Sequence, residues 1–291
     1  MNANGVLYLC ATPIGNLEDI TLRALRILKE VDLVAAEDTR HTRKLFSHYD
    51  IHTPLTSYHD HNRRSKGHYL IGQLLEGKNI ALVTDAGLPG VSDPGEDLAS
   101  MAVGEGIKVV PVPGPSASLT ALVASGLPAS RFCFEGFLPA RGKERSARLL
   151  DLKREMRTMV FYEAPHRLKA TLSDLLKVFG DRRVCVAREL TKFYEEIWRG
   201  SLREAAERFA LHPPKGEITL VLEGAGTQEE AGDAGPGGNC RTAQELASMV
   251  QDFEQKGLTR KEAIKEASVK AGIPKREVYS ALLDQKKTGG E

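Results

Sequence analysis

Acidic and basic side chains follow four predicted strands of this chain, at the point where each strand ends. Ligands of open α/β sheets lie outside the carboxyl ends of the strands, where a carboxylate can fix a hydroxyl or an amine. We therefore expect the four clusters to converge on one ligand site. For Glu189 and Lys192 a structural ion pair is the alternative, since such networks also bury charge. The clusters are Glu37-Asp38-Thr39-Arg40, Asp85, Glu163–Arg167 and Arg188–Lys192.

The segment Ala86–Glu96, which follows the predicted strand Ile80–Thr84, is rich in glycine and proline. Its glycines leave the backbone bare, and its prolines stiffen it. A loop of about ten residues exceeds the two to six that usually join a strand to a helix. A ligand can therefore reach the main chain here, and Asp85 and Asp93 are the acidic groups that the loop presents.

Composition points to a soluble, multidomain globular protein. The chain has 291 residues, of which 41% are hydrophobic and 27% charged, and two or three domains are expected at this length. Its four cysteines are scattered without a CxxC pair, which is typical of reduced thiols. The start lacks a signal-peptide pattern, and no window reaches the roughly 18 apolar residues of a membrane span. We expect a cytoplasmic protein that contacts no membrane.

Strands and helices alternate through most of the chain, which predicts α/β domains. We expect a first α/β domain over residues 1–126 with a mostly parallel sheet, and a second over residues 127–224. A Gly-, Ala- and Glu-rich linker is expected over residues 225–240. The predicted strands are Val6–Ala11, Leu33–Ala36, Ile80–Thr84, Lys108–Val110, Thr158–Tyr162, Arg183–Ala187 and Glu217–Leu222.

Residues 241–291 are predicted to form a separate helical module. Apolar residues recur at helical spacing, Thr259–Glu262 matches a capping box, and Pro274 suits the first position of a third helix. A Gly turn between short helices is the helix-turn-helix pattern, although a small three-helix packing module fits the spacing equally well. The apolar stripe is Leu246, Met249, Val250 and Phe253.

Two segments are locally basic although the net charge is only +1. Arg40–His68 holds six of the eight histidines, and Arg141–Arg157 holds seven basic against three acidic residues. Each segment is either a solvated face or a surface that faces RNA. His59 and His61 could bind a metal, but no second cluster of ligands lies at metal spacing, so we expect no metal. Phosphate contact or plain surface histidines are the interpretations we favour.

Familiar nucleotide-binding motifs are absent. The chain has neither GxxxxGK[ST] nor GxGxxG, and no nucleophile triad stands out, which disfavours P-loop phosphoryl transfer and ordinary dinucleotide binding.

Seven motifs in order resemble the ribosomal RNA small subunit methyltransferase I family of the tetrapyrrole methylase superfamily. The resemblance runs from about Val6 to Gly224, and many members carry a helix-turn-helix extension similar to the terminal module. One departure is Leu88, where the family commonly has Thr. The motifs are ATPIGN (Ala11–Asn16), AAEDTRHT (Ala35–Thr42), VTDAGLPGVSDPG (Val83–Gly95), VPGPSA (Val112–Ala117), FCFEGFLP (Phe132–Pro139), FYEAPHR (Phe161–Arg167) and ARELTK (Ala187–Lys192).

The resemblance implies two α/β domains with S-adenosylmethionine between them and a homodimer. It also implies 2′-O-methylation of a cytidine ribose in the decoding region of 16S rRNA, within the small ribosomal subunit. The cofactor-binding residues that it implies are Pro13, Gly15, Asp85, Ala86, Gly87, Val91, Ser92, Asp93, Ser116, Ala117 and Tyr162.

A ribose hydroxyl needs its proton removed, or its developing charge stabilised, before it attacks a methyl group. We predict that Lys192 serves this role with Glu189 holding it, and that Asp38 or Glu37 is the alternative base. The residues expected to contact RNA are Arg40, His41, Glu163, His166 and Arg167. Two other hypotheses stay open: a methylase of a corrinoid or tetrapyrrole precursor, and a ligand-sensing regulator that binds nucleic acid.

Overall fold

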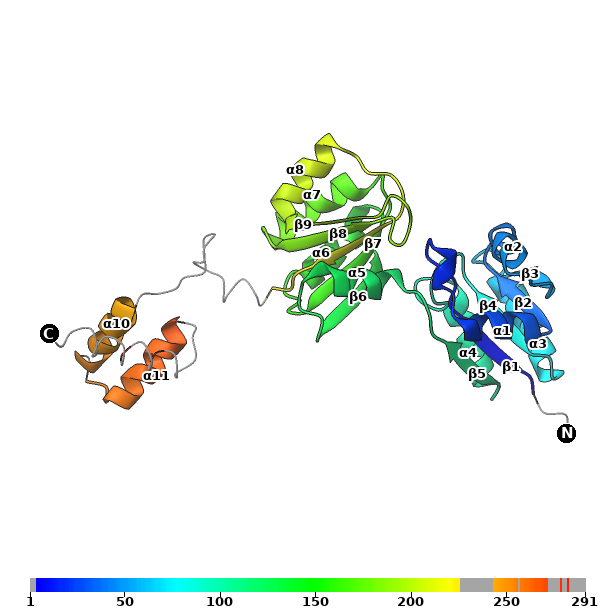
Figure 1. Cartoon of the computed structure of the whole chain (residues 1–291), viewed down its shortest axis with the longest axis horizontal. Helices are drawn as coiled ribbons and strands as arrows, with labels where there is room; N and C mark the ends of the chain where they lie inside the picture. The colour runs from blue at the N-terminus through cyan, green and yellow to red at the C-terminus, as the bar shows by residue number, and fades with distance from the viewer. Residues whose placement is uncertain (1–3, 226–242, 256, 272–277, 279–281, 283–291) are drawn as a thin grey trace. The chain divides into compact units, whose positions relative to one another are not determined.

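The computed structural model describes residues 4–225, 243–255, 257–271, 278 and 282 (Figure 1). The chain divides into two compact units, Met1–Ala225 and Gly226–Glu291. None of the helices in the described ranges is long and apolar enough to cross a membrane.

The first sheet has five strands, and every pairing in it is parallel. This confirms the predicted mostly parallel sheet. Strand β4 (Ile80–Val83) lies at its centre with all four residues buried, as its continuous apolar run predicted. The order is β3 (Leu55–Ser57), β2 (Leu33–Ala36), β4, β1 (Val6–Cys10) and β5 (Lys108–Val112).

Helices cover both faces of this sheet. Ala81 and Val83 pack in one cluster with α1 (Leu22–Glu30) and α2 (Thr39–His48). Ile80 and Leu82 face the opposite cluster, which includes side chains of α3 (Arg63–Leu75) and α4 (Gly95–Gly104). Because successive side chains of a strand point to opposite faces, one short strand serves two cores and fixes where the loop after it begins.

Sequence patterns missed α2, β3 and α3, which cover most of the basic segment Arg40–His68. Asp38 ends the loop after β2 and caps α2, its carboxylate accepting the N–H of Arg40 at 2.7 Å. Strand β3 has only three residues, none fully buried, so it carries little hydrophobic signal. The basic residues of this segment therefore lie largely on the exposed faces of α2 and α3.

The second sheet is mixed. Its order is β6 (Phe132–Phe137), β7 (Thr158–Glu163), β10 (Ile218–Leu222), β8 (Arg183–Arg188) and β9 (Glu196–Ser201). Only β6 and β7 pair in parallel; the other three pairings are antiparallel. Strand β9 was not predicted, because its side chains are only half-buried at the edge of the sheet.

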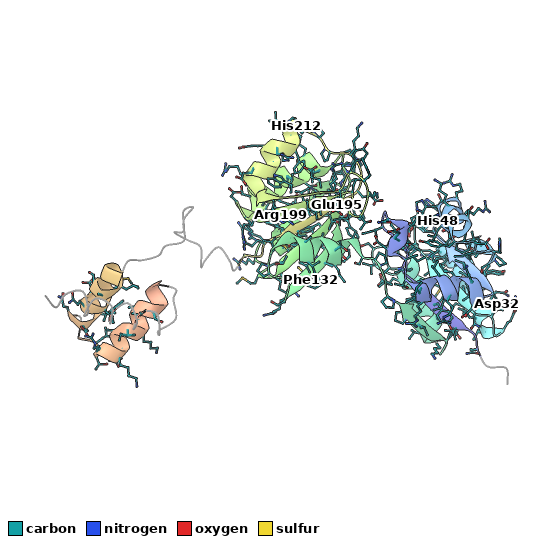
Figure 2. The ribbon with its side chains drawn as sticks, in the orientation of Figure 1. Asp32, His48, Phe132, Glu195, Arg199 and His212 are labelled. Carbon is teal, nitrogen blue, oxygen red and sulfur yellow. The ribbon has the colours of Figure 1, made fainter. Side chains whose placement is uncertain are left out.

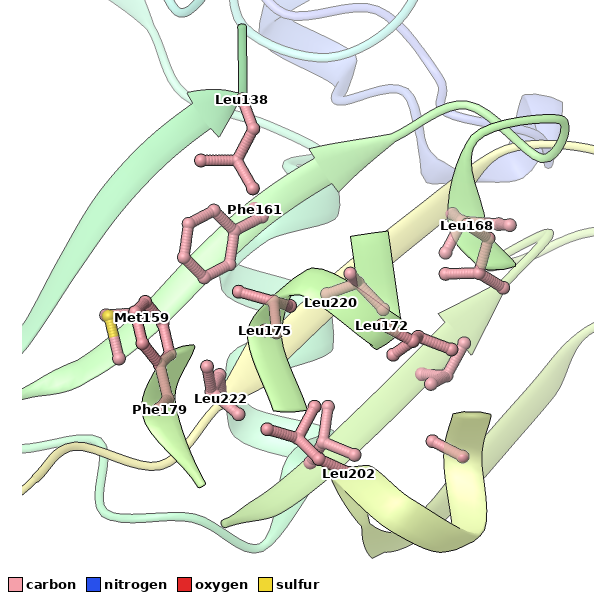
Figure 3. Close-up of a cluster of buried hydrophobic side chains, with 14 of the residues drawn as sticks. Leu138, Met159, Phe161, Leu168, Leu172, Leu175, Phe179, Leu202, Leu220 and Leu222 are labelled. Carbon is pink, nitrogen blue, oxygen red and sulfur yellow. The ribbon is translucent and has the colours of Figure 1, made fainter. Parts of the chain in front are cut away.

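One face of the second sheet carries a leucine-rich core. Helix α7 (Leu168–Phe179) places Leu168, Leu172 and Leu175 against Phe161, Leu220 and Leu222 of the strands (Figure 3). Helices α6 (Gly142–Leu152) and α8 (Leu202–Leu211) add to the same cluster. In α6, Leu149 and Leu152 are buried, whereas Leu150 is exposed.

Helix α5 (Ala117–Ser125) packs on the opposite face of the second sheet. Its Ala121 and Leu122 lie against Val160, Cys185 and Val221. The predicted boundary at residue 126 stays a prediction, and α5, although it precedes that boundary, belongs by its packing to the second sheet. The small residues of α5 let it lie close to the strands.

The second unit contains α10 (Ala243–Gln255) and α11 (Arg260–Ala271), with Val250 packed against Ala263, Ile264 and Ala267. The predicted stripe is confirmed for Leu246 and Val250, which are buried. The predicted capping box is half present, because the carboxylate of Glu262 accepts the N–H of Thr259 at 3.0 Å. The turn at Gly272, the helix start at Pro274 and the linker after Ala225 lie outside the described residues.

Candidate active site

The loops after β1 and β4 are joined at the carboxyl edge of the first sheet. Thr12 and Gly87 exchange two backbone hydrogen bonds, at 2.9 and 3.0 Å, and the hydroxyl of Thr12 donates to the carbonyl of Thr84 at 3.0 Å. Gly87 has φ +86°, a conformation that favours glycine. The loop that carries Pro13 and the loop that carries Asp85 are therefore held side by side at this edge.

Glu37 and Asp85 come together from the ends of β2 and β4. The hydroxyl of Thr84 donates to Oε2 of Glu37 at 2.6 Å, and Oδ1 of Asp85 accepts the N–H of Asp38 at 3.1 Å. Burial, and then the charge of Glu37, raise the pKa of Asp85. Asp85 therefore offers a half-buried carboxylate that is held by one backbone donor.

The carboxylate of Asp38 is hydrogen-bonded to Arg40 and is not free to act as a base. Its carboxylate accepts from the backbone and from the guanidinium of Arg40, with Nη2 to Oδ2 at 2.7 Å. These hydrogen bonds hold the pKa of Asp38 well below its usual range. This disfavours Asp38 as the base, and the guanidinium of Arg40 is engaged in the same pair. His41 is exposed on the same helix.

Asp93 fixes the shape of the glycine-rich loop. Its carboxylate accepts the N–H groups of Gly90, at 2.9 and 3.0 Å, of Val91 at 3.3 Å and of Gly95 at 2.7 Å. Burial raises the pKa of Asp93 even though these amides oppose the shift. Asp93 therefore fixes the shape of the loop, and its expected contact with a ligand stays a prediction. Val91, Ser92 and Ala86 are exposed on the loop that it shapes.

Lys192 lies in the loop between β8 and β9, between two carboxylates. Its Nζ donates to Oε1 of Glu189 at 2.9 Å and to Oε2 of Glu217 at 3.0 Å. Burial by itself lowers the pKa of Lys192, but the hydrogen bonds to Glu189 and Glu217 outweigh it and the pKa is raised. The hydrogen bond from Lys192 holds the pKa of Glu189 low. The ion pair expected as one of two alternatives is present, and it keeps Lys192 charged.

The Lys192 loop contacts the loop after β1. The N–H of Asn16 donates to Oγ1 of Thr191 at 3.1 Å. A Cβ added to Gly15 would lie 2.4 Å from Cγ of Lys192 and 2.9 Å from Oγ1 of Thr191, so only glycine fits there. Two predicted clusters far apart in sequence, a cofactor motif and a catalytic one, are thus brought together.

Ser116, Ala117 and Tyr162 have clear local roles. Ser116 caps α5, its Oγ accepting the N–H of Leu119 at 3.5 Å, and Ala117 is the first residue of that helix. The ring of Tyr162 packs on Phe134 and Phe137, with ring centroids 5.0 and 5.7 Å away. Tyr162 is therefore fixed in orientation by its aromatic neighbours.

Glu163 is buried and Arg167 is half-buried, and the two side chains are paired with each other. The Glu163 side chain is only 1% exposed, and its Oε1 lies 3.3 Å from Nε of Arg167. It also accepts the hydroxyl of Thr171, while Arg167 donates to the carbonyl of Leu138 at 2.6 Å. A carboxylate so enclosed holds β7 to α7. His166, between them in sequence, is exposed.

The basic segment Arg141–Arg157 divides into paired and exposed residues. Arg145 lies 2.8 Å from Asp174, Arg148 pairs with Glu135, and Arg157 lies 2.8 Å from Glu155. Arg141 and Lys143 are exposed at the start of α6. Part of the charge excess is thus paired, while Lys153 and Arg154, directly after α6, are exposed like the residues at its start.

The rings of His59 and His61 lie 6.0 Å apart, on the loop between β3 and α3. In the part of the chain that the structure describes, no group of three or more His, Cys, Asp or Glu side chains is placed to hold a metal ion.

Several residues of the site were missed by sequence reasoning. Thr12 and Thr84 tie the strand ends together, Thr191 accepts from Asn16, and Glu217 is the second partner of Lys192. The position of Thr12 and Thr84 at strand ends was a usable signal for the first two. Nothing local marks Glu217, because its pairing depends on how β8 and β10 align.

Comparisons with known proteins agree with this geometry. The model of the Tetrapyrrole (Corrin/Porphyrin) Methylases matches residues 6–206. The chain is 50% identical over 279 residues to a ribosomal RNA small subunit methyltransferase I of Halalkalibacterium halodurans, covering 95% of this chain and 94% of that protein. It is also 50% identical over 277 residues to the protein of that name in Bacillus subtilis, with the same coverage.

A solved structure shares the fold at low identity. The uroporphyrin-III C-methyltransferase of Thermus thermophilus, complexed with S-adenyl homocysteine, matches with a TM-score of 0.54 and 20% identity. The match covers 77% of this chain and 100% of that one. The family model spans most of the chain, and the two bacterial relatives match nearly all of it. The chain therefore belongs to the tetrapyrrole methylase family and, within it, to the ribosomal RNA small subunit methyltransferases I.

Proposed function

We propose that this protein methylates the ribose 2′-oxygen of a cytidine in the decoding region of 16S rRNA, using S-adenosylmethionine. The relatives' names support small-subunit rRNA as the substrate. The observation that carries the chemistry is Lys192, an ammonium held by Glu189 and Glu217 whose loop contacts Gly15 and Asn16. Such a group can stabilise negative charge on an attacking oxygen beside a cofactor loop.

The residues at the carboxyl edge of the first sheet fit S-adenosylmethionine. Gly87 lies where three loops meet, because a Cβ there would be 3.7 Å from both Ile14 and the carbonyl of Pro115. Its bare backbone lets a ligand approach, and Asp85 adds a half-buried carboxylate suited to hydroxyls or an amine. Two comparisons support the same cofactor. The family is one of methylases, and the uroporphyrin-III C-methyltransferase that shares this fold is complexed with S-adenyl homocysteine.

When bound, S-adenosylmethionine supplies the methyl group. The chain's own part is to hold the ribose oxygen in line and to stabilise its charge. Lys192 is protonated, so it acts as a charge stabiliser and not as the proton acceptor. Of the two carboxylates named for that role, Asp38 is held ionised by Arg40, which makes it a weak base. Glu37, which already accepts from Thr84, is the remaining candidate of the two.

For RNA contact we propose exposed cations and histidines in place of Glu163, which is buried, and of Arg167, which is half-buried and paired with it. His41, in α2, and His166, after β7, are exposed. Arg141 and Lys143 are exposed at the start of α6. Lys and Arg contacts to phosphates give affinity, while the base must be recognised by other groups. We further propose that the protein acts in the cytoplasm as a homodimer, as the family resemblance implies.

The test uses radiolabelled S-adenosylmethionine and small ribosomal subunits. We expect label in 16S rRNA, at one cytidine, that survives alkali because 2′-O-methylation protects the adjacent linkage. Label that alkali releases would exclude the ribose oxygen. Absence of transfer to subunits and naked rRNA, together with transfer to a corrinoid precursor, would replace the proposal with the tetrapyrrole alternative.

A further inference from the structure

Two aromatic side chains stand exposed directly after Lys192. Phe193 is 94% exposed and Tyr194 69% exposed, and their ring centroids lie 5.0 Å apart at an interplanar angle of 90°. They belong to the loop between β8 and β9, where Glu195 also lies (Figure 2). Neither ring takes part in the hydrophobic clusters of the described chain.

The loop that carries these rings is held by its own hydrogen bonds. The N–H of Lys192 donates to the carbonyl of Glu189 at 3.0 Å, and the N–H of Glu195 donates to the carbonyl of Lys192 at 3.1 Å. The carboxylate of Glu195 accepts the N–H of Thr191 at 2.7 Å. The rings are thus displayed by an ordered turn that is anchored to Asn16 through Thr191.

The charges around the rings disfavour phosphate. The carboxylates of Glu189 and Glu217 hold the ammonium of Lys192, and the carboxylate of Glu195 accepts the N–H of Thr191 in the same loop. The nearby guanidinium of Arg188 is paired with Glu196. A phosphate would meet net negative charge there, whereas a neutral base would not. Carboxylates also accept from the amino group of cytosine, which is a recognised pairing.

The surroundings also disfavour a protein partner. Interfaces between proteins bury a continuous apolar core, while this pair of rings is flanked by charged side chains on its own loop. Proteins that read unpaired RNA stack its bases on exposed aromatic rings. A planar, neutral base is therefore the occupant that suits both the rings and the charges.

We propose that Phe193 and Tyr194 form a stacking platform for an unpaired base of the RNA, next to the ribose that Lys192 serves. This inference rests on the proposed function and adds residues that position the substrate. It predicts that the platform acts on RNA binding and leaves cofactor binding unchanged.

The test replaces both rings by leucine in the full-length protein, which keeps an apolar side chain but removes the stacking face. We expect the KM for small subunits to rise about 5- to 150-fold, the range expected for the loss of stacking on one base. The affinity for S-adenosylmethionine, measured by calorimetry, should not change. Phe193→Tyr, which keeps both rings, should leave the KM close to that of the wild type. Tyr69→Leu, at an exposed ring on α3, is the matched control.

A second readout does not depend on methyl transfer. A single-stranded RNA containing pyrrolo-cytidine should lose fluorescence on binding the wild type, and should lose less with the leucine variant. Unchanged KM and unchanged quenching in that variant, with an active wild type, would refute the platform and leave the proposed function standing. An inactive wild type would refute the function while the quenching still reports on the platform. A change of oligomeric state on ultracentrifugation would assign the rings to an interface between copies.

Discussion

The N–H of Asn16 donates a hydrogen bond of 3.1 Å to Oγ1 of Thr191, across 175 residues of sequence. This contact joins the loop after β1 to the loop that holds Lys192. Thr191 adopts φ +65°, which is uncommon for a β-branched residue and marks local strain. The position of the ammonium therefore depends on how closely these two loops approach.

Gly15→Ala should disable the enzyme by separating the two loops. Its Cβ would lie 2.4 Å from Cγ of Lys192 and 3.0 Å from the carbonyl of Leu190, so the loop must move. Misplacement of about 1 Å can cost about a hundredfold in rate. Single-turnover methylation measures the loss. Gly72→Ala, in α3 with nothing within 4 Å, is the control and should stabilise the fold by about 0.5–1 kcal/mol.

Lys192→Met should lower kcat about 100- to 1000-fold, the usual cost of removing one group that stabilises an oxyanion. Affinity for S-adenosylmethionine should change little. The raised pKa of Lys192 keeps wild-type Lys192 charged through neutral pH, so kcat should show no loss attributable to this residue below its ordinary pKa of 10.5. Near-normal kcat at saturating cofactor and RNA would reject the lysine assignment.

Asp85→Asn should stabilise the fold while weakening cofactor binding. The raised pKa of Asp85 means that ionising it costs more in the folded than in the unfolded chain. The variant's advantage should therefore be absent below its ordinary value of 3.8 and grow as pH rises through the raised value. Urea titrations across pH measure this. Cofactor affinity should fall about 10- to 100-fold, the loss expected for one hydrogen bond to a charged group.

An Asp85→Asn variant that is less stable than wild type at neutral pH would contradict this interpretation. Asparagine can still accept the N–H of Asp38, so loss of that hydrogen bond would not explain such a result.

The sequence predicts those parts of the fold whose signal is local. Strand β4 is a continuous buried run bounded by turn residues, and it was placed correctly. Strand β3 was missed because three half-buried residues at a sheet edge leave almost no hydrophobic pattern. The packing of α5 on the second sheet was also beyond local signals, because it depends on which surface its small side chains meet.

For the site, the residue types could be predicted from the sequence, but their hydrogen-bond partners and burial could not. The motifs brought attention to Asp93 and Glu163, yet only the structure shows the first bonded to loop amides and the second buried beside Arg167. Likewise, nothing in the sequence pairs Lys192 with Glu217. Whether a carboxylate serves chemistry or architecture depends on contacts between residues that are distant along the chain.

Removal of residues 226–291 should leave a folded core. The cluster around Val250 and Ile264 contains only residues of the second unit, and the clusters of the two sheets contain none of them. We expect the truncated chain to keep its affinity for S-adenosylmethionine. Binding to small subunits should weaken and depend less steeply on salt, since Lys261 and Lys265 are exposed on α11. Loss of cooperative unfolding in the core would show that the units depend on each other.

Glu163→Ala and His166→Ala should separate architecture from RNA contact within one motif. Removing the Glu163 carboxylate leaves Arg167 without its buried partner, and breaking such a pair costs about 3–5 kcal/mol. His166 is exposed, so its replacement should change stability by less than about 0.5 kcal/mol. Urea unfolding measures the first effect, and filter binding of small subunits measures the second. We expect Glu163→Ala to lose stability, and any protein that stays folded to bind RNA normally. We expect His166→Ala to keep its stability and bind RNA more weakly. The reverse pattern would return Glu163 to the RNA-contacting surface.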